Sequence, residues 1–209
     1  MSRPFRSWTE RGFLLGGILI ILMTWGANLL ATLEAPADVS GHSAASDLYL
    51  WLMLMFNGLA FATVGIAYEN YQRLLTDGVF ATRYVIGFLF IADGALHLLA
   101  FNEHLSDSFW AAGFFAAFAP IQIVVGVEMP YLGRRFYPVW TGLTAFFIAA
   151  YALTRTMAVW PIGVVEAVDP LGILSKLVEV LTIIFLIGLA RADRPEPLPL
   201  PRPAASGEP

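Results

Sequence analysis

The chain has 209 residues, of which 58% are hydrophobic and 13% charged, and its mean hydropathy is +0.69. Soluble domains are nearer half apolar and a quarter charged, so the composition predicts an integral membrane protein with little mass outside the bilayer. The net charge of −4 offers no basic surface, so nucleic acid is not expected as a partner. The lack of cysteine excludes disulfides, thiolate catalysis, Cys-ligated zinc and iron–sulfur clusters.

The first three apolar runs cover residues 12–33, 48–68 and 79–101. Each is long enough for a transmembrane helix, which takes about 20 residues. The first run is too long for the apolar core of a signal peptide, which has about 7–15 residues. Ser46 and Asp47 are typical of a helix N-cap and are expected to begin the second span.

The last three apolar runs cover residues 109–131, 139–159 and 171–190. The stretch Ser106-Asp107-Ser108 is expected to cap the fourth span, and Asp169, followed by proline, to cap the sixth. The fold predicted is therefore all-α, a bundle of six transmembrane helices.

Two features predict details of helix geometry. Pro120 cannot donate to the carbonyl of Ala116, so we expect a kink there, with Gln122 as a candidate partner for the freed carbonyl. Glycines spaced seven apart in the second and third spans are expected to permit close backbone contact. They are Gly58, Gly65, Gly87 and Gly94.

The placement of basic residues predicts the orientation of the bundle. All but two of the twelve Lys and Arg residues fall in segments that a six-span chain places on one side, and basic loops face the cytoplasm. We therefore expect a cytoplasmic N-terminus (residues 1–11), a disordered proline-rich cytoplasmic tail (residues 192–209), and a multi-pass protein of the plasma membrane. The residues concerned are Arg3, Arg6, Arg11, Arg73, Arg83, Arg134, Arg135, Arg191, Arg194 and Arg202.

Charged and polar residues inside the spans mark the candidate site. Asp93 and His97 lie one turn apart on one face of the third span, and Lys176 and Glu179 share a face of the sixth. Such groups are costly in lipid and usually face the bundle interior. Estimated depths place them in the outer half, so we expect one outward-facing pocket. Its candidate residues are Asp93, His97, Glu103, His104, Gln122, Tyr151, Arg155, Lys176 and Glu179.

Three interpretations of these residues stay open. The first is a structural network of buried ion pairs, in which Asp93 pairs with Lys176 or Arg155 and Glu179 pairs with Lys176. The second is a metal site, and the third is a pocket for protons or a small ligand. His97, His104 and Glu179 are the candidate metal ligands, and imidazole with carboxylate suits zinc or copper(II). Lys176 and Arg155 count against a metal because they repel cations unless they are paired. Haem b is not expected, because His97 and His104 share one helix and a bis-histidine haem needs facing helices.

Two stretches together resemble a group of uncharacterised bacterial multi-spanning membrane proteins. The first, residues 95–104 (ALHLLAFNEH), is followed by Trp110, Gly113-Phe-Phe and Gln122. The second, residues 154–163 (TRTMAVWPIG), is followed by Glu166, Asp169, Leu171-Gly172 and Lys176–Glu179. The group pairs a His-containing span ending in Glu-His with an Arg-Thr loop and a final helix bearing Glu.

The likeness covers roughly half of the chain. Met157 and Asn102 replace the glycine and the proline usual in the group, and the second change leaves open whether the third span continues to His104. The resemblance carries no known function, but it implies that five residues belong to one recurring pattern. They are His97, Glu103, His104, Arg155 and Glu179.

The function predicted is a small membrane protein whose outward-facing polar pocket binds a metal ion or a small polar ligand. A non-catalytic accessory subunit of a larger membrane complex is the first alternative, and a proton-coupled transporter is the second. Nucleotide-binding and hydrolase motifs do not occur, so no catalytic residue is assigned.

Overall fold

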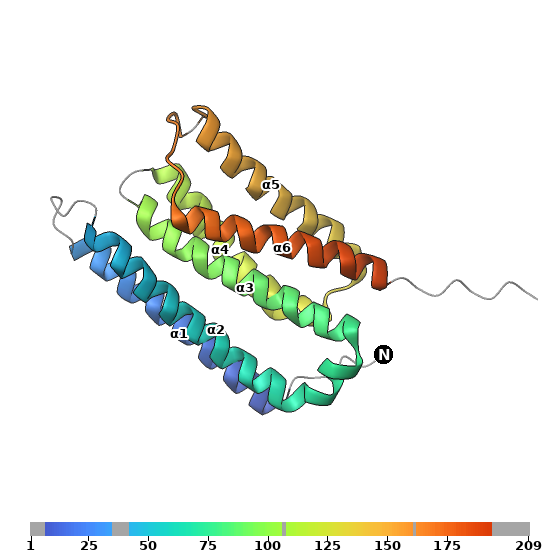
Figure 1. Cartoon of the computed structure of the whole chain (residues 1–209). Helices are drawn as coiled ribbons and strands as arrows, with labels where there is room; N and C mark the ends of the chain where they lie inside the picture. Colours follow the sequence, from blue (N-terminus) through green and yellow to red (C-terminus); the bar gives the residue numbers. More distant parts are fainter. Residues whose placement is uncertain (1–6, 35–41, 106–107, 161, 194–209) are drawn as a thin grey trace, which may run out of the picture.

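The structure is a computed structural model that describes residues 7–34, 42–105, 108–160 and 162–193, with only the helical backbone for residues 42–47. These residues contain no β-strand and form six α-helices that are long and apolar enough to cross a membrane (Figure 1). The predicted all-α architecture with six spans is thus confirmed. The helices are α1 (Trp8–Glu34), α2 (His42–Thr76), α3 (Gly78–His104), α4 (Phe109–Glu128), α5 (Tyr137–Thr156) and α6 (Pro170–Ala192), with short 3-10 helices η1 (Met129–Tyr131) and η2 (Arg134–Phe136) between α4 and α5.

The second helix is longer at both ends than its apolar run. It begins at His42, so the expected cap at Ser46 and Asp47 was wrong. It continues to Thr76 because the polar stretch after residue 68 is rich in helix-forming residues, and a helix does not have to end where it leaves lipid. Asp77 alone connects α2 to α3, and its side chain caps α3 by accepting from the Phe80 amide at 2.9 Å.

The other boundaries lie within a few residues of the predicted ones. Helix α1 already begins at Trp8, and α5 runs from Tyr137 to Thr156. Both remaining caps are confirmed. The Ser108 hydroxyl accepts from the Ala111 amide at 3.2 Å, and the Asp169 carboxylate accepts from the Gly172 amide at 2.5 Å. The predicted disordered tail lies outside the described residues from position 194 onward.

Helix α3 occupies the centre of the bundle. It packs against α1, α2, α4 and α6, whereas α1 pairs with α2 on one side and α5 packs on α6 on the other (Figure 1). Most of the α3 side chains are buried, including Asp93, His97 and Asn102. A polar residue on α3 is therefore held inside the protein rather than against lipid.

Small residues allow the close contacts that the glycine spacing predicted. Gly58 on α2 faces Gly17 on α1, and on the other side of the bundle Gly87 faces Gly126 of α4. A methyl group added to Gly94 would lie 2.8 Å from the carbonyl oxygen of Ala119. The backbones of α3 and α4 thus pack without intervening side chains, which fixes the position of α4 relative to the polar residues of α3.

A polar clasp joins three helices at the end of the bundle where α3 begins. The Arg83 guanidinium donates to the Asp193 carboxylate at 2.7 Å and to the Pro130 carbonyl at 3.2 Å, and the Tyr137 hydroxyl donates to the same carboxylate at 3.0 Å. Asp193, directly after α6, is thereby fixed to α3 and α5. The opposite end of the bundle carries the candidate site.

Candidate metal centre and adjoining pocket

Five polar side chains from three helices meet in the interior. Asp93 and His97 come from α3, Gln122 from α4, and Ser175 and Glu179 from α6. All are buried, with Asp93 2% and Glu179 0% exposed. The spacing of four residues puts Asp93 and His97 on one face of α3, and it puts Ser175 and Glu179 on the face of α6 that packs against α3.

Gln122 bridges Asp93 and His97. Its amide nitrogen donates to Asp93 Oδ2 at 2.5 Å, and its amide oxygen lies 2.6 Å from His97 Nδ1. An amide oxygen can only accept, so Nδ1 carries the proton, and Nε2 of the neutral imidazole then carries the lone pair. The expectation that Gln122 serves the Ala116 carbonyl was wrong, because its amide is taken up by this bridge. Helix α4 continues through Pro120 as an α-helix.

Three potential ligand atoms converge on one point. His97 Nε2 lies 3.6 Å from Glu179 Oε1 and 4.0 Å from Asp93 Oδ1, and the potential ligand atoms of these three buried residues all lie within 4.8 Å of one another. The Ser175 hydroxyl is 2.8 Å from Asp93 Oδ1 and 3.4 Å from His97 Nε2. Two buried carboxylates and a lone pair require a cation or a proton to balance them.

Lys176 supplies part of that balance. Its ammonium group donates to Glu179 Oε1, which confirms the predicted pair between these neighbours on α6. The second carboxylate oxygen of Glu179, Oε2, is buried and has no hydrogen-bond partner among the described residues. Asp93 and Glu179 together carry one more negative charge than Lys176 offsets while His97 is neutral.

Arg155 belongs to a separate cluster at the end of α5. Its guanidinium pairs with Glu166 and lies 3.1 Å from Asp169 Oδ2, and the Glu166 amide donates to the Thr154 carbonyl at 3.0 Å. The loop between α5 and α6 is thereby folded back onto the end of α5. The predicted alternative in which Asp93 pairs with Arg155 was wrong, because the Arg155 guanidinium pairs with the two carboxylates of the adjacent loop instead. Their spacing from Arg155, eleven and fourteen residues, was the signal in the sequence.

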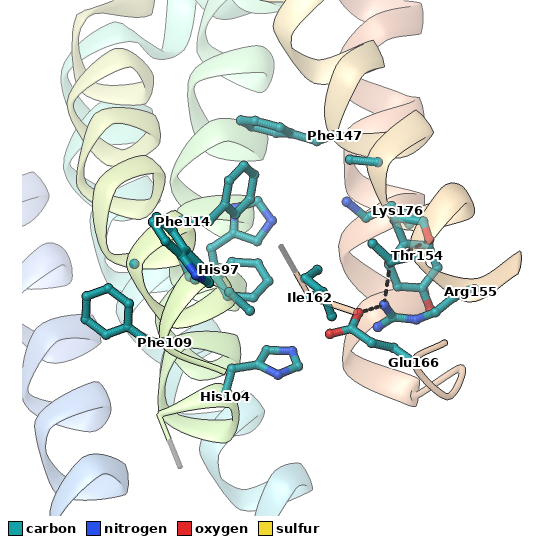
Figure 2. Close-up of a pocket in the computed structure, with 16 residues that line it drawn as sticks. His97, His104, Phe109, Phe114, Phe147, Thr154, Arg155, Ile162, Glu166 and Lys176 are labelled. Carbon is teal, nitrogen blue, oxygen red and sulfur yellow. Dashed lines mark hydrogen bonds and ion pairs between the residues drawn. The ribbon is translucent and has the colours of Figure 1, made fainter. Parts of the chain in front are cut away.

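A pocket of about 580 Å³ lies beside both clusters (Figure 2). Phenylalanine and tryptophan side chains form one part of its wall. The predicted site residues His97, His104, Tyr151, Arg155 and Lys176 also line it, as do six further residues: Ala111, Gly113, Ala150, Thr154, Ile162 and Glu166. The aromatic side chains were not predicted, because such residues at the ends of spans are typical of membrane-interface anchors. The aromatic lining residues are Phe109, Trp110, Phe114, Phe115 and Phe147.

The remaining predicted residues lie around this pocket. Helix α3 does continue through His104, whose ring stacks on Phe115 at 5.5 Å between centroids, outside the group of three ligand atoms. Glu103 lines a smaller cavity of about 40 Å³ beside Lys176. The Tyr151 ring lies 4.2 Å from the Arg155 guanidinium carbon. The structure thus gathers the predicted residues between the middle of the bundle and the end where α3 stops, but in two clusters rather than one.

No protein-family model, no curated protein and no solved structure matches the chain. Of the resemblance described above, the structure supports the multi-spanning helical architecture. The bacterial group and its motifs stay a hypothesis. Any function must therefore be argued from the site itself.

Proposed function

We propose that this membrane protein binds a divalent transition-metal ion at Asp93, His97 and Glu179. The observation that carries the proposal is the convergence of one imidazole and two carboxylates, all buried, with potential ligand atoms within 4.8 Å of one another. One nitrogen and two carboxylate ligands suit zinc, copper(II), iron(II) or manganese(II) better than calcium, which prefers oxygen ligands alone. His104, also considered as a ligand from the sequence, is not part of the proposed set.

The contacts around these ligands support the proposal. Metal-binding histidines almost always donate their second ring N–H to a carbonyl or carboxylate, which fixes the tautomer, and metal-binding carboxylates are hydrogen-bonded in turn. Gln122 does both here, because it accepts from His97 Nδ1 and donates to Asp93 Oδ2. The unpartnered oxygen Oε2 of Glu179 gives the site a further donor atom.

Lys176 makes a specific contribution to this proposal. Its ammonium pairs with the Glu179 oxygen that faces His97, so a bound metal ion has to displace it. We therefore expect Lys176→Met to bind metal more tightly than the native chain. Because His97 and Lys176 also line the large pocket, a metal ion there has coordination positions within reach of a pocket ligand.

Metal content measured on purified protein tests the proposal. The native chain, incubated with Zn²⁺, Cu²⁺, Fe²⁺ or Mn²⁺ and then desalted, is expected to retain a stoichiometric amount of at least one of them. His97→Ala and Glu179→Gln should lose it, whereas His104→Ala, with an equally large truncation at the pocket wall, should keep it. Retention of metal by His97→Ala, or no retention by the native chain, would refute a site at these three residues.

A proton is the second candidate occupant, and the Lys176–Glu179 pair favours it. With His97 protonated, the two carboxylates and the two cations are balanced without a metal ion. In that case neither the native chain nor any variant binds metal. The carboxyl bands in the infrared spectrum of the native chain should change with pH, and this change should be smaller in Asp93→Asn. A proton-coupled transporter is the functional alternative that this outcome favours.

We also propose that both ends of the chain face the cytoplasm of a plasma-membrane protein. In the described residues, four arginines lie within two turns of a helix end at the clasp end of the bundle, and the η2 arginines precede α5 there. The four are Arg11, Arg73, Arg83 and Arg191. The two cations of the other half, Arg155 and Lys176, are both paired with carboxylates. This asymmetry is the one that basic cytoplasmic loops produce. The site would then open toward the outside.

A further inference from the structure

We propose that the large pocket between α4 and α5 binds a neutral, planar ring compound with carbonyl oxygens, a molecule of the quinone class. The pocket holds about 580 Å³, within the range of roughly 300–1,000 Å³ typical of sites for small organic ligands. This inference is based on the volume and the lining of the pocket. It does not depend on metal binding at Asp93, His97 and Glu179.

The aromatic wall favours a flat ring. Phe114 and Phe147 bring α4 and α5 together at the deep end, where their ring centroids are 5.4 Å apart at an angle of 81°, and Phe147 is only 3% exposed. Phe109 and Trp110 are more than half exposed and form the rim at the start of α4. A planar molecule entering past this rim meets aromatic faces and edges, which attract rings beyond the gain from area alone.

The polar side of the pocket lies opposite the aromatic one. Figure 2 shows Thr154, Arg155 and Lys176 on one side, and Phe109 and Phe114 on the other. The ammonium group of Lys176 has three N–H donors, and Glu179 takes one contact from it. A ligand carbonyl is the group that a remaining donor can bind. One edge of the ligand is therefore expected to carry hydrogen-bond acceptors, and its body to be apolar.

Charge balance favours a neutral ligand over an anion. The Arg155 guanidinium is paired with Glu166 and Asp169, and the Lys176 ammonium is paired with Glu179. Among the described residues that line the pocket, both Lys and Arg cations thus have a carboxylate partner. A carboxylate ligand would have to enter beside these acidic groups without a cation of its own, whereas a carbonyl compound brings no charge into the site.

Gly113 offers a way to fill the pocket without disturbing the bundle. It lines the pocket, and a side chain built on it meets no atom within 4 Å. Gly142 on α5 has equally open space but does not line the pocket. Gly113→Leu and Gly142→Leu are therefore matched variants, because both exchange a helical glycine for leucine and only one occupies the site.

The test is a titration of the full chain in detergent with naphthoquinone, read by calorimetry and by quenching of tryptophan fluorescence. We expect saturable binding by the native chain and by Gly142→Leu, with binding to Gly113→Leu weaker by at least about tenfold. Far-UV circular dichroism and gel filtration confirm that each variant is folded.

Two results would overturn the inference. Equal binding by Gly113→Leu and Gly142→Leu would show that the quinone dissolves in the detergent or binds elsewhere. Tighter binding of naphthoate than of naphthoquinone would show that the pocket selects an anion. Repeating the titration with a chelator and with Asp93→Asn, which alters a proposed metal ligand that does not line the pocket, separates this site from the metal site. Quinone binding should persist when metal binding is lost.

Discussion

The bridge through Gln122 is the contact on which the arrangement of the buried cluster most depends. Gln122→Leu keeps a side chain of similar size but removes the hydrogen bonds to Asp93 Oδ2 at 2.5 Å and to His97 Nδ1 at 2.6 Å. Interhelical hydrogen bonds in membrane proteins contribute about 0.6 kcal/mol on average and up to about 1.7 kcal/mol. Two of them give an expected loss of roughly 1–3 kcal/mol in the free energy of unfolding.

The measurement is unfolding of the purified protein by SDS, followed by circular dichroism. Gln72→Leu is the matched control, because Gln72 is exposed near the end of α2 and its side chain makes no hydrogen bond in the described structure. Unfolding of Gln122→Leu at the same SDS fraction as Gln72→Leu would refute the inference that the bridge holds α4 to α3. If the cluster binds metal, the same variant should also lose about 10–100-fold in affinity.

Three further predictions concern helix packing, the α5–α6 loop and topology. Gly126→Val should lower the free energy of unfolding by about 1–3 kcal/mol, because a side chain at this position meets the backbone of α3. Gly142→Val is the control, because its side chain enters open space. Equal stabilities of the two variants would contradict the α3–α4 contact. Arg155→Met should speed hydrogen exchange in the loop after α5, because it removes the pairs that hold the loop, and unchanged exchange would show that the backbone contacts suffice. The chain has no cysteine of its own, so a cysteine introduced at Ser43 or at Ser206 is the single labelling site in each variant. The two variants should be labelled from opposite sides of the membrane. Labelling of both from one side would exclude six spans.

The fold could be predicted from the sequence because lipid imposes length and apolarity on every span. Six runs of sufficient length identify six helices, and the basic residues in alternate loops predict which ends of the helices face the cytoplasm. Helix ends were less predictable. The apolar run of α2 ends near residue 68, but its helix continues to Thr76. Hydropathy reports where a helix meets lipid, while caps and backbone preferences decide where it stops.

The site was predictable only in part. Spacing within one helix placed Asp93 with His97 and Lys176 with Glu179, and both pairs are seen. Contacts between helices depend on rotation about each helix axis, which the spacing within a helix does not determine. For that reason the bridging role of Gln122 and the aromatic wall of the pocket were missed. The pairing of Arg155 with Glu166 and Asp169 required the fold of a loop rather than a helical period.

The central position of α3 has a consequence for how the protein is made. Its Asp93 and His97 leave the ribosome well before their partners Ser175 and Glu179, which lie some eighty residues later in the chain. Gln122 on α4 is the first partner to follow. An α3–α4 hairpin, joined by the glycine contacts and the Gln122 bridge, is thus the earliest unit that can shelter these groups from lipid. Insertion of α6 then completes the cluster. A chain truncated before residue 175 lacks these partners, so its α3 should stay associated with the insertion machinery for a longer time.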